Sequence, residues 1–137
     1  MRRLAGIDYG RKRLGVALTD PLGITVQSRP TLEVSGFADA VSQAASFAFS
    51  ENAERIVLGL PLNMDGSSGD MAKEVERFGS ALEAETGIPV CYWDERLTSE
   101  QAKSILKNAG KRHERGQVDQ VAAALMLESY LRAHPAE

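Results

Sequence analysis

The chain has 137 residues, of which 43% are hydrophobic and 26% charged, a balance typical of folded globular proteins rather than disordered chains. This length suits one domain, and we expect a single domain over residues 1–137. No apolar run approaches a membrane span or the core of a signal peptide, so we expect a cytoplasmic protein. The formal net charge of -3 argues mildly against nucleic-acid binding, unless the basic residues are clustered.

The N-terminal part of the chain predicts three short strands. Apolar runs at residues 4–9 and 14–19 are separated by a short basic connection. Residues 20–23, Asp-Pro-Leu-Gly, have the order typical of a type I turn and lead to a third strand at residues 24–28. Tight connections between consecutive strands predict an antiparallel meander.

The rest of the chain alternates helices and strands. Two short apolar runs, at residues 55–60 and 88–93, predict strands that are buried on both faces. Strands separated by helices imply parallel crossovers, so we predict an α/β fold with a mixed five-stranded sheet flanked by helices. Apolar residues spaced by three and four predict helices within residues 37–48, 71–82 and 118–126.

Three further segments are more polar. Residues 63–69 have the composition of a loop. Thr98, followed by Gln101, fits a capping box that opens another helix. Residues 109–117 are basic and contain two glycines, which predicts a loop before the last helix.

Ten of the 16 lysine and arginine residues fall in two short segments. If the segments meet in space they form a basic rim on an acidic body, and if they do not they are ordinary solvated surface. The ten residues are Arg2, Arg3, Arg11, Lys12 and Arg13, then Lys103, Lys107, Lys111, Arg112 and Arg115.

Acidic residues follow two of the predicted strands and begin the last helix. Asp8 ends an apolar run, where a carboxylate is costly unless it is paired or bound to metal. Asp94 and Glu95 follow the strand at residues 88–93, and we expect Asp119 in the first turn of the last helix. Because the carboxyl ends of parallel strands meet at one edge of a sheet, these acids are candidates for one site.

Each acid also has a structural interpretation. Asp119 would favour a helix N-terminus electrostatically. Asp94 or Glu95 would pair with Arg96 or cap the turn. Asp8 is harder to explain in this way, because an acid in a core strand needs a dedicated partner.

Clustered carboxylates are typical of sites for hard divalent cations. Carboxylate oxygens suit Mg²⁺ or Mn²⁺, and two such ions about 4 Å apart catalyse phosphodiester hydrolysis in many nucleases. Without metal the acids would repel each other and raise each other's pKa. The two histidines lack ligand-spaced neighbours, which argues against zinc.

Four segments resemble, in order, the motifs of the YqgF family, also called RuvX. They are GIDYGRKRLGVA at residues 6–17, GLPLNMDG at 59–66, DERLTS at 94–99 and VDQVAAA at 118–124. The resemblance covers nearly the whole chain and implies a ribonuclease H-like fold. It also implies a nuclease that processes the 5′ end of pre-16S rRNA, or alternatively a Holliday junction resolvase.

The resemblance implies that Asp8, Glu95 and Asp119 are both catalytic and metal-binding, with Asp94 as the alternative to Glu95. We expect two Mg²⁺ or Mn²⁺ ions and a nucleic-acid partner, an RNA precursor rather than a DNA junction. A resolvase would act as a homodimer, although no sequence feature indicates a dimer surface. The expected nucleic-acid contacts are Arg11, Lys12, Arg13, Arg96, Lys111, Arg112 and Arg115.

Two other functions fit parts of the sequence. Asp-x-Gly followed by a hairpin resembles the first phosphate loop of sugar kinases, heat-shock chaperones and actin. Those proteins close two such domains around a nucleotide, and this chain has one such motif. A non-catalytic nucleic-acid-binding module is the second alternative, and the intact acids argue against it.

Overall fold

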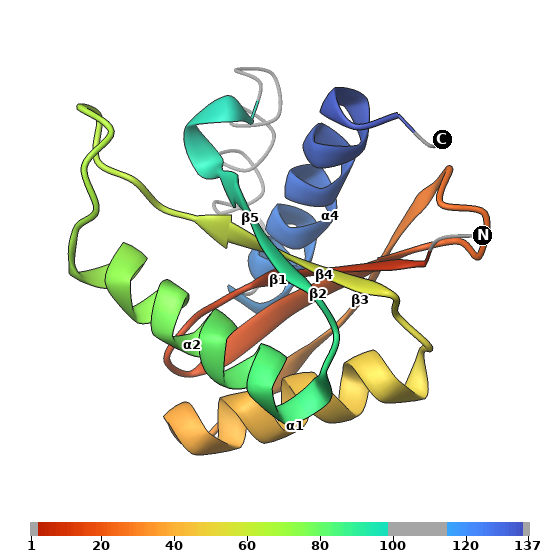
Figure 1. The fold of residues 1–137 in the computed structure, drawn as a ribbon, viewed down its shortest axis with the longest axis horizontal. Helices are drawn as coiled ribbons and strands as arrows, with labels where there is room; N and C mark the ends of the chain where they lie inside the picture. Colours follow the sequence, from red (N-terminus) through yellow and green to blue (C-terminus); the bar gives the residue numbers. More distant parts are fainter. Residues whose placement is uncertain (1–2, 99–114, 136–137) are drawn as a thin grey trace.

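The computed structural model describes residues 3–98 and 115–135, and for residues 115–120 it describes the backbone alone. The strands are β1 (Leu4–Asp8), β2 (Arg13–Thr19), β3 (Val26–Glu33), β4 (Arg55–Leu60) and β5 (Val90–Asp94) (Figure 1). The helices are α1 (Phe37–Ser50), α2 (Asp70–Thr86) and α4 (Arg115–Ala133), with a 3-10 turn, η1 (Glu95–Leu97), after β5.

The strands form one mixed sheet in the order β3-β2-β1-β4-β5. Strands β1, β2 and β3 pair antiparallel, whereas β4 pairs parallel with both β1 and β5. This arrangement confirms the predicted sheet of three antiparallel strands followed by two parallel ones.

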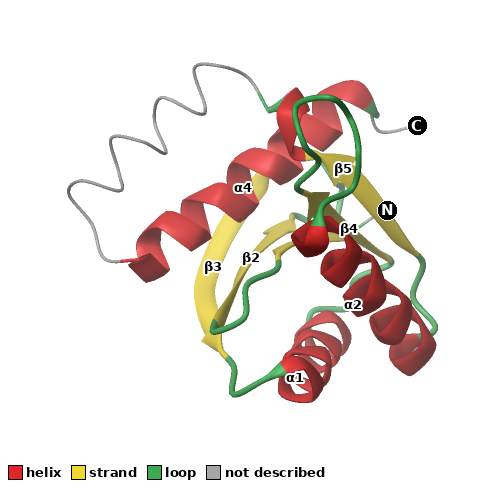
Figure 2. Ribbon diagram, turned by 90° about the vertical axis from the view of Figure 1, so that its left-hand side faces the viewer, coloured by secondary structure: helices red, strands yellow, loops and turns green. Residues whose placement is uncertain are grey.

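Helices cover both faces of the sheet. Helices α1 and α2 lie on one face and α4 on the other (Figure 2). Because side chains alternate across a strand, Ile7 and Leu58 pack under α1 and α2, whereas Leu4 and Val57 pack under α4. Among the described residues, no helix is both long and apolar enough to cross a bilayer.

Helix α4 lies unusually close to β1. A Cβ atom built on Gly6 would lie 3.0 Å from the Cβ of Leu127, which is tighter than ordinary van der Waals contact. The absence of a side chain at Gly6 therefore allows the helix to rest directly on the strand that carries Asp8.

Several predicted boundaries are wrong. Strand β3 extends to Glu33 instead of ending at residue 28, because it is an edge strand that tolerates Pro30 and exposed polar residues. Strand β5 begins at Val90 rather than at residue 88, after Pro89, which lacks a backbone N–H.

The last helix begins at Arg115, not at residue 118, so Asp119 lies in its second turn rather than its first. Its first turn contains Gly116, whose low helix propensity hides the start of the helix in the sequence. The helix predicted after Thr98 lies outside the described residues, as do residues 109–114 of the loop predicted at residues 109–117, whereas residues 115–117 of that loop are helical.

Candidate active site

Three parallel strands end at one edge of the sheet, and Asp8 is the last residue of the first of them. Asp8 pairs with Gly15 of β2. On its other side the register pairs Ile7 with Leu58, which places Asp8 next to Gly59 of β4. Asp8 therefore has a glycine beside it on each neighbouring strand.

Glu95 comes from the far side of β4. It is the first residue of η1, directly after β5, and it is half-buried. Its carboxyl group shares a hydrogen bond with that of Asp8. Burial raises the pKa of Glu95, the bond to Asp8 lowers it, and the negative charge of Asp94 raises it further. The structure thus brings together two of the acids singled out in the sequence.

Asp94 has different partners from Glu95. It caps η1 by accepting a hydrogen bond of 2.9 Å from the backbone N–H of Arg96. It also forms an ion pair with the Arg96 guanidinium, with Nη2 and Oδ2 2.7 Å apart. The pairing and capping that the sequence suggested for one of these two acids therefore belong to Asp94.

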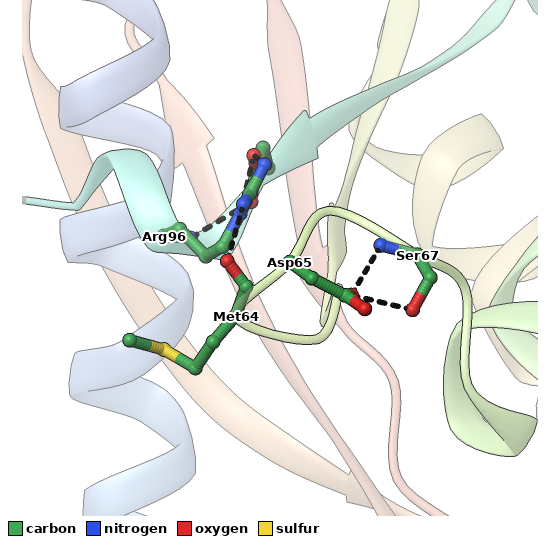
Figure 3. Close-up of polar contacts among 5 residues, drawn as sticks. Met64, Asp65, Ser67 and Arg96 are labelled. Carbon is green, nitrogen blue, oxygen red and sulfur yellow. Dashed lines mark hydrogen bonds and ion pairs between the residues drawn. The ribbon is translucent and has the colours of Figure 1, made fainter.

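Arg96 also connects η1 to the loop between β4 and α2. Its Nη1 donates a hydrogen bond of 3.3 Å to the carbonyl oxygen of Met64 (Figure 3). Within the loop, Asp65 accepts hydrogen bonds from the Ser67 hydroxyl at 2.6 Å and the Ser67 backbone at 2.9 Å, which lower the pKa of Asp65. The loop at residues 63–69 is predicted from the sequence. The bond between Arg96 and Met64 is not, because the two residues are far apart in the chain.

Ser129 of α4 ties that helix to the same segment. The indole Nε1 of Trp93 donates to the Ser129 hydroxyl at 3.0 Å, and the hydroxyl donates to the carbonyl oxygen of Leu97 at 3.3 Å. The two bonds bracket Glu95 between a strand residue and the last residue of η1. They fix the position of α4 relative to the candidate site.

Asp119 lies in the described backbone of α4, and its side chain is outside the description. Ala123 and Leu127, four and eight residues later, are fully buried against the sheet. The helical repeat predicts that position 119 lies on the same side of α4 as these two residues. Among the described side chains there is no group of three or more metal-ligating residues, so the third acid of the predicted site is untested.

The first basic segment lies beside α2. Arg11 forms an ion pair with Glu74, with Nη2 and Oε1 2.9 Å apart, although two-thirds of its side chain is exposed. The Tyr9 hydroxyl donates to the same carboxylate at 2.5 Å. Burial and this bond raise the pKa of Tyr9 to about 12, and the bonds from Arg11 and Tyr9 lower the pKa of Glu74. Nothing in the sequence spacing signalled Glu74.

The other predicted nucleic-acid contacts are placed only in part. Lys12 is exposed, and Arg13 is half-buried at the start of β2. Lys111 and Arg112 lie outside the described residues, and Arg115 begins α4 with its side chain undescribed.

The fold matches that of known junction-resolving enzymes. A structure of Thermus thermophilus RuvC in complex with a Holliday junction substrate has a TM-score of 0.64 and 17% identity, over 100% of this chain and 99% of that one. The fowlpox virus Holliday junction resolvase has a TM-score of 0.57 and 12% identity, over 96% and 98% of the two chains. These likenesses define the fold as ribonuclease H-like.

Sequence comparison identifies the family. The model described as "RuvX: Holliday junction resolvase" matches residues 2–133, and the chain belongs to this family. A protein of Syntrophus aciditrophicus named "Putative pre-16S rRNA nuclease" is 46% identical over 133 residues, covering 96% of this chain and 89% of that one. A Lactobacillus gasseri protein of the same name is 43% identical, covering 96% of each chain. The family predicted from the four motifs is confirmed.

Proposed function

We propose that this protein is a divalent-metal-dependent nuclease that hydrolyses phosphodiester bonds in nucleic acid. The observation that carries the proposal is the meeting of the Asp8 and Glu95 carboxyl groups at the carboxyl edge of the sheet, where Asp8 ends β1 and Glu95 follows β5. Half-buried acids this close stabilise a fold poorly by themselves, and their proximity therefore indicates a role in binding or chemistry.

The donor set fits Mg²⁺ or Mn²⁺. Asp8 and Glu95 supply hard carboxylate oxygens, and we assign Asp119 of α4 as the third ligand. Divalent ions held by these residues would supply activation of the attacking water and charge stabilisation at the leaving oxygen, and we expect two of them. The two carboxyl groups share a hydrogen bond in the place where we put the cations.

The surrounding residues hold these acids in place. Asp94 and Arg96 neutralise each other and fix η1, which keeps the Glu95 backbone at the end of β5. We therefore assign Arg96 to holding η1 and its loop rather than to phosphate contact. We propose that the phosphates are contacted by the basic residues predicted from the sequence, namely Arg11, Lys12, Arg13, Lys111, Arg112 and Arg115.

We propose the 5′ end of pre-16S rRNA as the substrate. The names of relatives that are 46% and 43% identical over nearly the whole chain favour it. The description of the family model favours the alternative, a four-way DNA junction. Symmetric cleavage of a junction would require a homodimer.

A substrate panel tests the proposal. Purified protein would be incubated with Mn²⁺ or Mg²⁺ and one of three substrates: a precursor rRNA segment, an unrelated single-stranded RNA or a four-way DNA junction. Asp8→Asn protein from the same purification would reveal contaminating nucleases. We expect metal-dependent cleavage that is fastest on precursor rRNA. Faster cleavage of the junction would favour the resolvase, and no cleavage of any substrate would contradict nuclease activity.

A further inference from the structure

Glu95 reaches Asp8 by crossing a strand. Strand β4 lies between β1 and β5 in the sheet. Because neighbouring strands are about 4.8 Å apart, the backbones of β1 and β5 are separated by about 10 Å. The two side chains can share a hydrogen bond only if they meet above β4.

The residue of β4 at this crossing is Gly59. It is buried, it pairs with Trp93 of β5, and it lies beside Asp8 of β1. A Cβ atom built on Gly59 would lie 2.7 Å from Glu95 Oε1, 3.3 Å from its Cγ and 3.4 Å from its Cδ. The carboxyl end of Glu95 therefore rests directly on the bare backbone of this residue.

The backbone on each side of this contact is held in place. Strand β4 is hydrogen-bonded to a strand on each side, so its backbone is held in register. The Glu95 backbone is held by η1, which Asp94 caps. An added methyl group would therefore have to move the Glu95 carboxyl group, the one freely rotating part of the contact.

We propose that Gly59 is a positioning residue for Glu95, because its missing side chain leaves the space through which that carboxyl group reaches Asp8. The inference rests on the proposed function, since it gives Glu95 a ligand's role. It also explains how an acid that follows β5 serves a site next to β4, a strand that has no acid of its own.

Metal affinity tests the inference. The proteins would be wild type, Gly59→Ala and Gly36→Ala, the last a matched control because a Cβ on Gly36 meets nothing within 4 Å. Binding of Mn²⁺ alone would be followed by electron paramagnetic resonance of the free ion. We expect Gly59→Ala to weaken binding about 10- to 100-fold and the control to leave it unchanged. Wild-type affinity in Gly59→Ala would overturn the proposal.

Thermal melting of the metal-free protein provides a second, independent test. Gly59→Ala should lower Tm in the wild-type background and have little effect in a Glu95→Ala background, where the added methyl group has space. An equal loss of Tm in both backgrounds would overturn the proposal. If Gly59→Ala does not fold, the double variant with Glu95→Ala should fold, and its failure to fold would also overturn the proposal. If wild-type protein binds no Mn²⁺, the proposed function fails, whereas the melting comparison still decides the contact between Gly59 and Glu95.

Discussion

The carboxyl groups of Asp8 and Glu95 share a hydrogen bond, although Asp8 ends β1 and Glu95 directly follows β5, which is not a neighbour of β1 in the sheet. Strand β4 between them ends in Gly-Leu and contributes no acid. The site is therefore built across a strand rather than along one. Its geometry depends on three features: the Asp94–Arg96 pair that holds η1, the missing side chain at Gly59 of β4, and the close packing of α4 on β1 at Gly6.

Separate substitutions of Asp94 and Glu95 should distinguish the roles of these two neighbouring acids. We expect Glu95→Gln to reduce metal-dependent cleavage at least about 100-fold, because it removes a charged metal ligand. Asp94→Asn should cost much less, since the amide oxygen can still cap Arg96 N–H. Rates would be measured under single-turnover conditions. A larger loss in Asp94→Asn than in Glu95→Gln would transfer the ligand assignment to Asp94.

Arg96→Ala should loosen the loop at residues 63–69. The substitution removes the hydrogen bond to Met64 and the ion pair with Asp94. Hydrogen exchange should become faster in loop and η1 peptides and stay unchanged in α1. Arg77→Ala, an exposed arginine on α2, provides the control. Unchanged loop exchange in Arg96→Ala would show that Arg96 does not hold the loop.

Gly6→Ala should destabilise the packing of α4 on β1. The new methyl group would lie 3.0 Å from Leu127 Cβ, an atom fixed to the helix backbone. We expect a loss of about 1–3 kcal/mol in the free energy of unfolding, measured with urea. Gly36→Ala should change it by less than about 1 kcal/mol. Equal stability of Gly6→Ala and wild type would mean that α4 is not held close to β1.

Glu74 should make stability depend on pH in the acid range. Its pKa in the folded protein is lowered by hydrogen bonds from Arg11 and Tyr9, so its stabilising effect is present above the ordinary value of 4.5 and is lost as pH falls. The unfolding free energy of wild type should exceed that of Glu74→Gln at neutral pH, and the gap should narrow by about pH 3. Glu76→Gln, an exposed neighbour on α2, should show little difference at either pH. If the difference in unfolding free energy between wild type and Glu74→Gln widens in acid, Glu74 is not stabilised by Arg11 and Tyr9 as described.

The sequence predicted the five strands and the mixture of antiparallel and parallel pairing, because apolar runs and tight turns are local signals. It failed at β3, an edge strand whose polar residues show no alternation, and at the start of α4. Within α4 the predicted apolar residues include Val121 and Leu125, which are half-buried, whereas Ala123 and Leu127 face the sheet. Helix α4 has apolar residues on all sides, so their spacing alone does not identify its buried side.

The sequence predicted which acids are candidates for the site but not how they are arranged in space. Asp8 stood out because it ends a core strand, and Asp94 and Glu95 could not be distinguished by spacing. The choice between them depends on Arg96, which pairs with Asp94, and on Gly59, which leaves room for Glu95. Contacts between residues so far apart in the chain leave no periodic signal in the sequence.

Single-turnover cleavage of precursor rRNA by Asp8→Asn tests the central claim most directly. Glu54→Gln is the matched control, because this exposed acid precedes β4 at the opposite edge of the sheet. We predict that Asp8→Asn keeps the fold and Tm of wild type but loses at least about 1,000-fold in Mn²⁺-dependent rate, whereas Glu54→Gln keeps the wild-type rate. Cleavage at the wild-type rate by pure, folded Asp8→Asn would contradict the account.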